Sequence, residues 1–268
     1  SMKIALLALA KGRDLGLRTH FYAKFASAAG GYVFGEAGKT LGIKKYRSAF
    51  YDLLKRLGID VRFVSSDMTD EEISTYFDEN TRMFFGETIA NPALNVLDIE
   101  LFAKAAHDNG LPFIIDNTFA TPINCRPFEF GADIVTHSTT KYMDGHGVCV
   151  GGAIVDSGNF DWAAHAERFP GLTTPDESYH GLVYTERFGK MAYITKATSQ
   201  LMRDLGSIQS PQHAFYLGLG LQTLHLRVPR HCENARRIAQ YLHDDPRVAW
   251  INYPDLEDDS QHALQQKY

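Results

Sequence analysis

Short apolar runs alternate with amphipathic segments from about residue 45 to residue 158, and this alternation restricts the fold more than any other feature. The run at 111–118, LPFIIDNT, is apolar almost throughout, as expected of a parallel strand that is covered on both faces. The segment at 96–110, VLDIELFAKAAHDNG, has helical apolar spacing and closes at Asn109-Gly110. Strand and helix patterns in this order predict right-handed crossovers and an α/β fold, with a mostly parallel sheet covered by helices on both faces.

The same patterns predict the remaining elements. Thr69 and Glu72 have the spacing of a capping box and predict a helix over 69–77. The polar, turn-rich stretch at 169–189 predicts a long loop that can bear binding residues. The other predicted helices are 46–59, 192–206 and 213–243, and the other predicted strands are 60–66, 81–87, 132–141 and 151–158.

The composition excludes several classes of protein. The 268 residues are 44% hydrophobic, and a net charge of -5 with an isoelectric point near 6.1 gives no basic face for nucleic acid or acidic lipid. The longest apolar run, 4–10, is too short to cross a membrane and lacks the cleavage pattern of a secretory signal. The cysteines are widely spaced and odd in number, which predicts a cytoplasmic protein without a disulfide framework. They are Cys125, Cys149 and Cys232.

Polar residues follow three of the predicted strands at the point where each strand ends. In an open parallel α/β sheet, ligands bind beyond the carboxyl ends of the strands. A carboxylate, several hydroxyls and a lysine are therefore expected to converge on one edge of the sheet. The three groups are Glu87 with Asn91-Pro92, Asp116 with Asn117 and Thr118, and Ser138 with Thr140 and Lys141.

This combination meets the chemical requirements of pyridoxal phosphate. A lysine amine forms a Schiff base with the aldehyde of the cofactor. A carboxylate keeps the pyridine nitrogen protonated, so that the ring accepts electrons. Hydroxyl groups hold the phosphate by charge-assisted hydrogen bonds. Asp116 and Lys141 lie 141 - 116 = 25 residues apart, which leaves room for a loop, a turn and one more strand.

Each residue taken alone also has an ordinary explanation. Lys141 fits a solvated lysine, and Asp116 fits a cap on the turn that follows it. The hydroxyls of Ser138 and Thr140 fit partners for loop backbone groups. Only the combination of these residues in one region indicates a cofactor site.

The stretches ETIANP at 87–92, PFIIDNTFATP at 112–122 and ADIVTHSTTKYMDGHG at 132–147 carry a family resemblance, together with 150–158, 169–189 and 217–242. From about residue 51 onward, the chain resembles the pyridoxal phosphate-dependent enzymes of cysteine and methionine metabolism. Within them it is most similar to the O-acetylhomoserine sulfhydrylases, a branch that the Tyr-His-Gly-Leu segment at 179–182 favours.

The resemblance implies fold type I of the pyridoxal phosphate-dependent transferases and an enzyme of methionine biosynthesis. Such an enzyme replaces the γ-acetoxy group of O-acetylhomoserine by sulfide or a thiol, giving homocysteine or methionine. It implies that Lys141 forms the Schiff base and moves protons on the substrate. It also implies that Asp116 pairs with the pyridine nitrogen.

The resemblance assigns the other contacts of the cofactor as well. Ser138 and Thr140 are expected to bind the phosphate. Asn91 is expected near the phenolic oxygen, and Thr118 beside the ring. The expected assembly is a homotetramer built from dimers that share active sites, with a small amino acid and sulfide or a thiol as the other partners.

The sequence also departs from the family pattern. A Ser-Gly-x-Ala segment, a Tyr-Gly-Gly segment and a Tyr-x-Arg segment, which bind the phosphate or stack on the ring in the family, have no match near the N-terminus. The expected division is a poorly legible segment at 1–44, a cofactor-binding α/β domain at 45–245, and the start of a truncated C-terminal domain at 246–268. A strand and a helix start are expected within 248–268, and the small C-terminal domain of the fold is expected to be largely absent.

Three alternatives remain open from the sequence. A cystathionine γ-synthase or γ-lyase of the same family would use the same Lys141 with a different acceptor. A non-catalytic remnant would keep the fold as an oligomerisation or binding module. His137, His146 and Cys149 lack the paired spacing of a zinc site, so no metal is expected.

Overall fold

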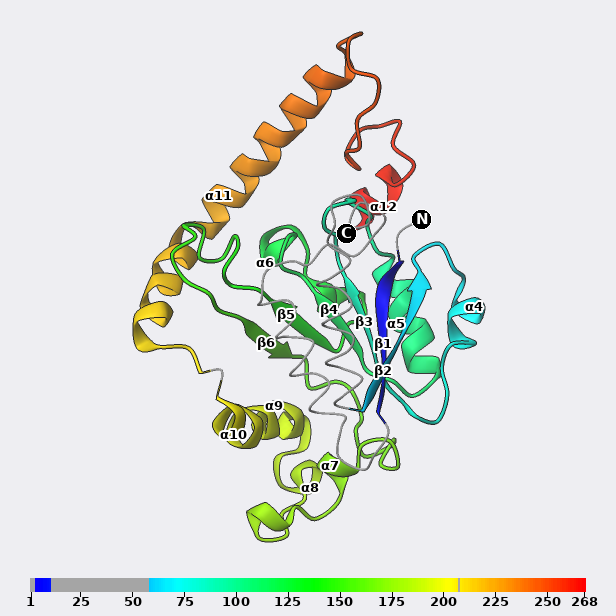
Figure 1. Ribbon diagram of the computed structural model, residues 1–268, viewed down its shortest axis with the longest axis vertical. Coiled ribbons are helices and arrows are strands. Elements are labelled where there is room, and N and C mark those ends of the chain that lie inside the picture. Colours follow the sequence, from blue (N-terminus) through cyan, green and yellow to red (C-terminus); the bar gives the residue numbers. More distant parts are fainter. Residues whose placement is uncertain (1–2, 11–57, 207) are drawn as a thin grey trace.

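The computed structural model describes residues 3–10, 58–206 and 208–268, so the helix predicted at 46–59, apart from its last two residues, and most of the segment at 1–44 lie outside the described residues. A six-stranded sheet with the order β2-β1-β3-β4-β5-β6 lies at the centre of the described part (Figure 1). The strands are β1 (Lys3–Ala10), β2 (Ile59–Ser65), β3 (Thr81–Glu87), β4 (Phe113–Asp116), β5 (Ile134–His137) and β6 (Ala153–Asp156).

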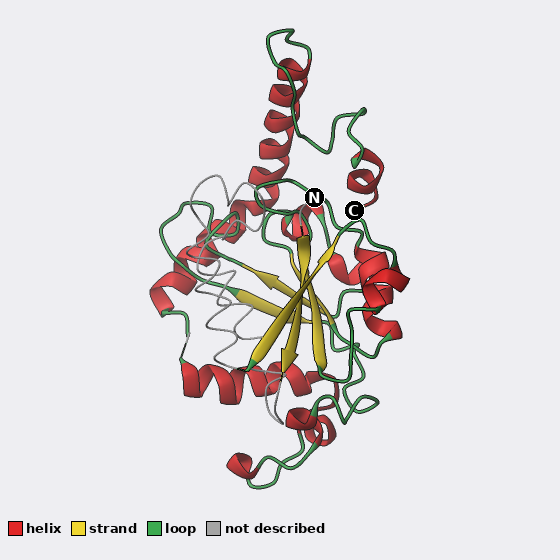
Figure 2. Cartoon of the chain, turned by 45° about the vertical axis from the view of Figure 1, so that its right-hand side comes forward, coloured by secondary structure: helices red, strands yellow, loops and turns green. Residues whose placement is uncertain are grey.

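Helices pack around this sheet and extend beyond its edge (Figure 2). The α-helices of the described part are α4 (Asp70–Ser74), α5 (Ile99–Asp108), α6 (Thr121–Asn124), α7 (Pro170–Thr173), α8 (Tyr184–Phe188), α9 (Ala192–Lys196), α10 (Arg203–Leu205), α11 (Pro211–His243) and α12 (His262–Lys267). A π-helical stretch, Ala197–Met202, joins α9 to α10, so the helix predicted at 192–206 forms as one nearly continuous run.

The central strands β3, β4 and β5 run parallel, whereas the strands on either side of them are antiparallel to their neighbours. The connection at 138–152 between β5 and β6 contains no helix. A strand that returns without a crossover element has to pair antiparallel, which explains the direction of β6. The parallel part of the sheet is the part whose carboxyl ends bear the polar residues.

Local sequence signals account for the helices beside β3 and β4. The capping box at α4 is confirmed, because Thr69 Oγ1 accepts a hydrogen bond from the Glu72 amide at 3.3 Å and the Glu72 carboxylate accepts one from the Thr69 amide at 3.0 Å. Asp98 caps α5 by accepting a hydrogen bond from the Leu101 amide at 3.3 Å. The predicted end of this helix is also confirmed, since Gly110 has a φ of +64° just beyond it.

Two hydrophobic clusters cover the two faces of the sheet. Phe113 on β4 and Phe102 on α5 belong to the first cluster. Ile114, the next residue of β4, belongs to the second, together with Trp162 and Tyr193, whose rings stack with centroids 5.4 Å apart. Successive strand residues point to opposite faces, so the almost unbroken apolar run of β4 supplies both clusters.

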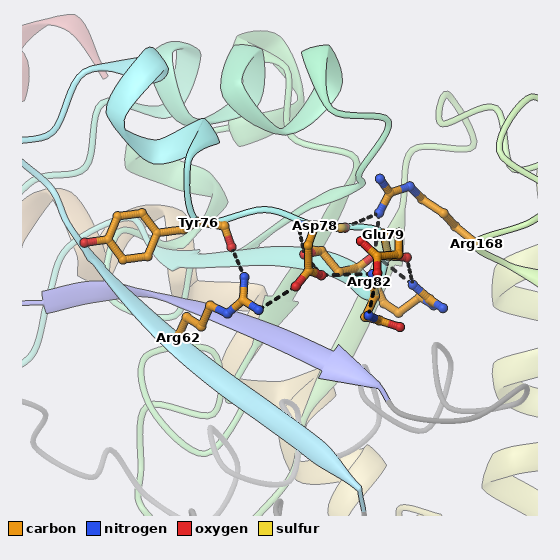
Figure 3. A network of polar contacts seen from close by, with 8 residues as sticks. Arg62, Tyr76, Asp78, Glu79, Arg82 and Arg168 are labelled. Atoms are coloured by element: carbon orange, nitrogen blue, oxygen red, sulfur yellow. Dashed lines mark hydrogen bonds and ion pairs between the residues drawn. The ribbon is translucent and has the colours of Figure 1, made fainter.

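A network of polar contacts fixes the segment before α7 to the start of β3 (Figure 3). Arg168 Nη1 donates hydrogen bonds to the carbonyl oxygens of Asp78 at 2.9 Å and Thr81 at 2.8 Å. Arg62 on β2 forms an ion pair with the Asp78 carboxylate at 2.5 Å and also donates to the Tyr76 carbonyl. The network lies at the start of β3, away from the carboxyl ends of the parallel strands, and its contacts are structural.

The predicted loop at 169–189 contains α7 and α8 and is held by a buried ion pair. Lys196 is 5% exposed, and its Nζ donates hydrogen bonds to Asp176 Oδ2 at 2.9 Å and to the Gly171 carbonyl at 2.7 Å. Asp176 in turn donates its amide to the Leu182 carbonyl at 2.9 Å. The Tyr-His-Gly-Leu segment is therefore fixed to α9 through Lys196 and Asp176.

The long helix α11 projects away from the sheet (Figures 1 and 2). It begins with Ser210 as its cap, slightly before the predicted start at residue 213. The strand expected from residue 248 is not formed, since 248–253 have no regular structure, whereas α12 is present. A lone extended segment has no neighbouring strand to pair its amides and carbonyls. No helix in the described part of the chain, α11 included, is long and apolar enough to cross a membrane.

Candidate active site

Three residues at the carboxyl ends of the parallel strands form one row. Glu87 on β3 is the register partner of Asp116 on β4, and Asp116 is the register partner of Thr136 on β5. Because Ile114 faces the cluster of Trp162, the period of two places Asp116 and its partners on that same face. The predicted carboxylate thus lies at a strand end, and it is 7% exposed.

Hydrogen bonds join Asp116 to Ser138 through Thr118. The Thr118 amide donates to Asp116 Oδ1 at 2.9 Å, and Thr118 Oγ1 accepts from the Ser138 amide at 2.8 Å. All three residues are buried. Thr118, predicted only as a neighbour of the cofactor ring, therefore links the ends of β4 and β5 and fixes the predicted carboxylate relative to the predicted phosphate-binding serine.

Lys141 follows Ser138 in a tight turn. The Lys141 amide donates to the Ser138 carbonyl at 3.2 Å, and its carbonyl accepts from the Gly145 amide at 2.8 Å. The side chain is partly exposed, and no hydrogen bond or ion pair within the described residues engages its amine. The amine of Lys196, by contrast, is held by two partners. Of these two lysines, Lys141 is the one available for covalent chemistry.

The hydroxyl of Thr140 contacts loop backbone. It accepts a hydrogen bond from the Gly151 amide at 3.0 Å and lies 3.3 Å from the Gly151 carbonyl oxygen. These contacts close the loop between Lys141 and β6, which is the ordinary role that such residues have in loops. Phosphate binding by Thr140 stays a prediction.

Two buried hydroxyl oxygens at this edge of the sheet, Thr136 Oγ1 and Ser138 Oγ, have no hydrogen-bond partner in the part of the chain that the structure describes. A buried hydroxyl that lacks a partner costs about 1–3 kcal/mol, and a bound group that supplies the partner removes this cost. Ser138 is one of the two residues expected to bind the phosphate. A buried carboxylate, an unpartnered hydroxyl and an available amine on one sheet edge are the groups that pyridoxal phosphate requires, so the residues present fit this cofactor.

Asn91 lies in the turn that follows β3, next to the row of strand ends. The backbone amide of Asn91 donates a hydrogen bond to Glu87 Oε2 at 3.4 Å. Burial and the charge of Asp116 raise the pKa of Glu87 to about 8, and the Asn91 amide opposes this shift. The expected position of Asn91 near the phenolic oxygen of the cofactor stays a prediction.

Arg227 on α11 fixes the turn that follows Lys141, a role that the sequence reasoning missed. Its guanidinium donates to the Tyr142 carbonyl at 2.9 Å and to the Gly220 carbonyl at 2.7 Å. At Gly220 a Cβ would lie 2.4 Å from the Met143 carbonyl oxygen, so only glycine lets α11 approach this turn. The one available signal was a glycine inside a helix, because such a residue lowers helix stability unless a close contact requires it.

Because of the buried histidine at the end of β5, His137, the folded chain is expected to lose stability in acid. Burial lowers the pKa of His137 to about 4, opposed in part by a hydrogen bond to the Asn117 backbone. An unfolded histidine takes up its proton near pH 6.5, so below that pH the unfolded chain binds more protons than the folded chain. The contribution of His137 to the free energy of unfolding is therefore fully present above about pH 6.5, and about 3 kcal/mol is lost as the pH falls to about 4. Urea unfolding of the cofactor-free chain across this range measures the loss.

The variant His137→Gln is neutral at every pH and is expected to lack this part of the pH dependence. His107→Gln is the matched control, because the hydrogen bond that the His107 ring donates to the Asp133 carboxylate raises the pKa of His107 and gives a dependence of opposite sign. Equal pH slopes in the wild-type chain and in His137→Gln would contradict the prediction.

The central parallel strands with helices packed on the sheet have the architecture of fold type I of the pyridoxal phosphate-dependent enzymes, and the carboxylate at the end of β4 and the lysine after β5 are residue types that this cofactor requires. A profile of the Cys/Met metabolism PLP-dependent enzyme family matches residues 44–268, and the chain belongs to this family.

Several known proteins are similar to the chain. The homocysteine/cysteine synthase of Kluyveromyces lactis is 47% identical over 80% of this chain and 48% of its own length, and the O-acetyl-L-homoserine sulfhydrylase 1 of Thermus thermophilus is 47% identical over 80% and 51%. A crystal structure of a putative O-acetylhomoserine (thiol)-lyase from Campylobacter jejuni has a TM-score of 0.80 and 30% identity, over 98% of this chain and 64% of that one. That protein carries an N'-pyridoxyl-lysine-5'-monophosphate. The chain spans about half the length of the curated relatives that it matches.

Proposed function

We propose that this chain supplies the catalytic sheet edge of an O-acetylhomoserine sulfhydrylase, which replaces the γ-acetoxy group of the substrate by sulfide or a thiol and gives homocysteine or methionine. The observation that carries the proposal is the hydrogen-bonded chain from Asp116 through Thr118 to Ser138, with the available amine of Lys141 three residues further on. The names of the relatives from Kluyveromyces lactis and Thermus thermophilus support this choice of reaction.

Pyridoxal phosphate, when bound, supplies an electrophilic aldehyde and a ring that accepts electrons from the substrate. Lys141 would hold the aldehyde carbon through its amine until the amine of the substrate displaces it. The released amine then moves protons at the Cα and Cβ atoms of the substrate, which is general acid-base work at a short distance. Its freedom from hydrogen bonds within the described residues suits a group that has to change partners during the reaction.

The other residues would hold charge at fixed positions. Asp116 would keep a proton on the pyridine nitrogen, since its carboxylate is buried and fixed by the Thr118 amide. Ser138 would donate its hydroxyl, which has no partner among the described residues, to the phosphate. Such preorganised groups do not have to reorient as charge develops, which is the largest common source of catalysis.

An assay of both products tests the proposed reaction. The chain with added pyridoxal phosphate, O-acetylhomoserine and sulfide is expected to form homocysteine and acetate in equal amounts. Replacing sulfide by cysteine separates the alternatives, because a cystathionine γ-synthase forms cystathionine and a γ-lyase consumes substrate without an acceptor. The variant Lys141→Ala is the negative control. Product formation with cysteine that exceeds the formation with sulfide would contradict the sulfhydrylase assignment.

The exposed side chains and the cysteines bear on the assembly and the compartment. We propose a homotetramer built from dimers, because many apolar side chains on α11 are exposed in a single chain, among them Phe215, Leu226 and Ile238. Light scattering that gave the mass of one chain would contradict it. The three cysteines are free, which supports a reducing compartment such as the cytoplasm.

A further inference from the structure

Glu87 lies beside the predicted cofactor carboxylate without having a role in the proposed function. It ends β3 as Asp116 ends β4, and the two residues are register partners on one face of the sheet. Neighbouring strands are about 4.8 Å apart, so two carboxyl groups start from adjacent backbone positions. The next residue of the same row, Thr136, brings a hydroxyl and no positive charge.

Glu87 also contacts the turn that bears Asn91. Its Oε2 accepts the Asn91 amide at 3.4 Å. The following residue of the strand end, Thr88, donates its hydroxyl to Asn117 Oδ1 at 2.9 Å and so fixes the turn after β3 to the turn after β4. The Glu87 side chain thus lies between Asp116, which is expected at the pyridine nitrogen, and Asn91, which is expected at the phenolic oxygen.

Two adjacent carboxyl groups at a partly buried site do not both ionise easily, because each negative charge raises the free energy of the other. Within the described residues, the groups that face Glu87 are the Asp116 carboxyl from β4 and the backbone amide of Asn91 from its own turn. Burial and the Asp116 charge together raise the pKa of Glu87 to about 8, so Glu87 keeps its proton at neutral pH. The two carboxyl groups therefore resist carrying two negative charges, and Glu87 is the member whose pKa is raised.

We propose that Glu87 is a positioning residue for the cofactor: a neutral carboxylic acid that leaves Asp116 as the one carboxylate facing the pyridine nitrogen and holds the Asn91 turn beside it. This inference rests on the proposed pyridoxal phosphate site. An ionised Glu87 would add a second negative charge that competes with Asp116 for the ring proton and would repel the Asp116 carboxylate.

A first experiment uses the cofactor-free chain and needs no activity. Because the pKa of Glu87 is raised above that of an unfolded glutamate, the folded chain holds the proton longer, and stability is lost as pH rises from about 4.5 to about 8. Relative to Glu87→Gln, the folding equilibrium constant of the wild-type chain is expected to fall on the order of 10³-fold across this range. Glu186→Gln, the same change on the exposed side of α8, is expected to leave the pH profile as it is in the wild-type chain.

A second experiment measures the affinity for pyridoxal phosphate by fluorescence titration. Glu87→Gln is neutral, and its amide oxygen can still accept the Asn91 amide, so we expect binding within about threefold of the wild-type chain. Leucine has a similar size but no acceptor, so Glu87→Leu loses the hydrogen bond from the backbone amide of Asn91. We expect this variant to bind pyridoxal phosphate about tenfold more weakly. The wild-type affinity is expected to fall above about pH 8, and this fall is expected to be absent in Glu87→Gln.

The outcomes separate the inference from the function on which it rests. A wild-type chain that binds no pyridoxal phosphate overturns the proposed function and the cofactor role of Glu87 with it. A wild-type chain that binds, with Glu87→Gln as weak as Glu87→Leu, overturns only the neutral positioning role, because the charge would then be required. A pH profile of stability that is the same in Glu87→Gln and the wild-type chain overturns the neutral state of Glu87.

Discussion

Lys141→Ala is expected to abolish covalent attachment of pyridoxal phosphate and to lower turnover by at least about 10³-fold, since both the nucleophile and the proton carrier are lost. The fold is expected to persist, because the contacts of Lys141 are made by its backbone amide and carbonyl, which alanine retains. Borohydride reduction of the wild-type chain followed by peptide mapping measures the attachment, and a pyridoxyl group is expected on Lys141.

Two other lysines serve as controls for this experiment. Lys190→Ala changes an exposed lysine and is expected to keep both labelling and turnover. Lys196 is expected to remain unlabelled in the folded chain, because Asp176 and the Gly171 carbonyl hold its amine in a buried site. A pyridoxyl group on either of these lysines would show that the catalytic lysine is misassigned.

Asp116→Asn is expected to lower kcat by about 10²- to 10³-fold, the effect of removing one preorganised charged group from a reaction centre. A neutral amide cannot keep the pyridine nitrogen protonated, so the ring withdraws electrons less strongly from the substrate. The lost interaction acts mainly in the transition state, and kcat is therefore expected to change more than KM. Steady-state kinetics with O-acetylhomoserine and sulfide measure both constants.

The structure supplies a control for the fold in this variant. Asparagine keeps an oxygen that can accept the Thr118 amide, so the hydrogen-bonded link to Ser138 is expected to survive. Asp116→Ala removes that acceptor as well, and it is expected to lower the stability of the chain by about 1 kcal/mol in addition to the loss of turnover. Near-normal kcat in Asp116→Asn would mean that another carboxylate, with Glu87 as the neighbour in register, faces the cofactor.

Several parts of the fold and site could be predicted from the sequence because they depend on neighbouring residues. The spacing of Thr69 and Glu72 predicts a capping box that the structure contains. The apolar run before Asp116 predicts a buried strand, and the carboxylate does lie at its end. Lys141 is expected at the end of a strand over 132–141; the strand is shorter and ends at His137, so Lys141 lies in the turn that follows it.

Other parts depend on residues that are far apart in the sequence. No local pattern indicates that Arg227 holds the Tyr142 carbonyl across 85 residues, because neither residue constrains the other until the helix packs on the turn. The strand expected from residue 248 is wrong for the same reason. Residues that favour an extended backbone form a strand only where a neighbouring strand pairs with them, and 248–253 have no such neighbour among the described residues.

The sequence by itself determined which chemical groups are present and that they follow the ends of strands, since the period of two, the caps and the turns act over a few residues. Only the tertiary structure decided which of these groups meet. It paired Glu87 with Asp116 in register, buried the amine of Lys196 in an ion pair and left the amine of Lys141 without a partner among the described residues. These choices depend on burial and on strand register, which are properties of the packed chain and not of any short segment of it.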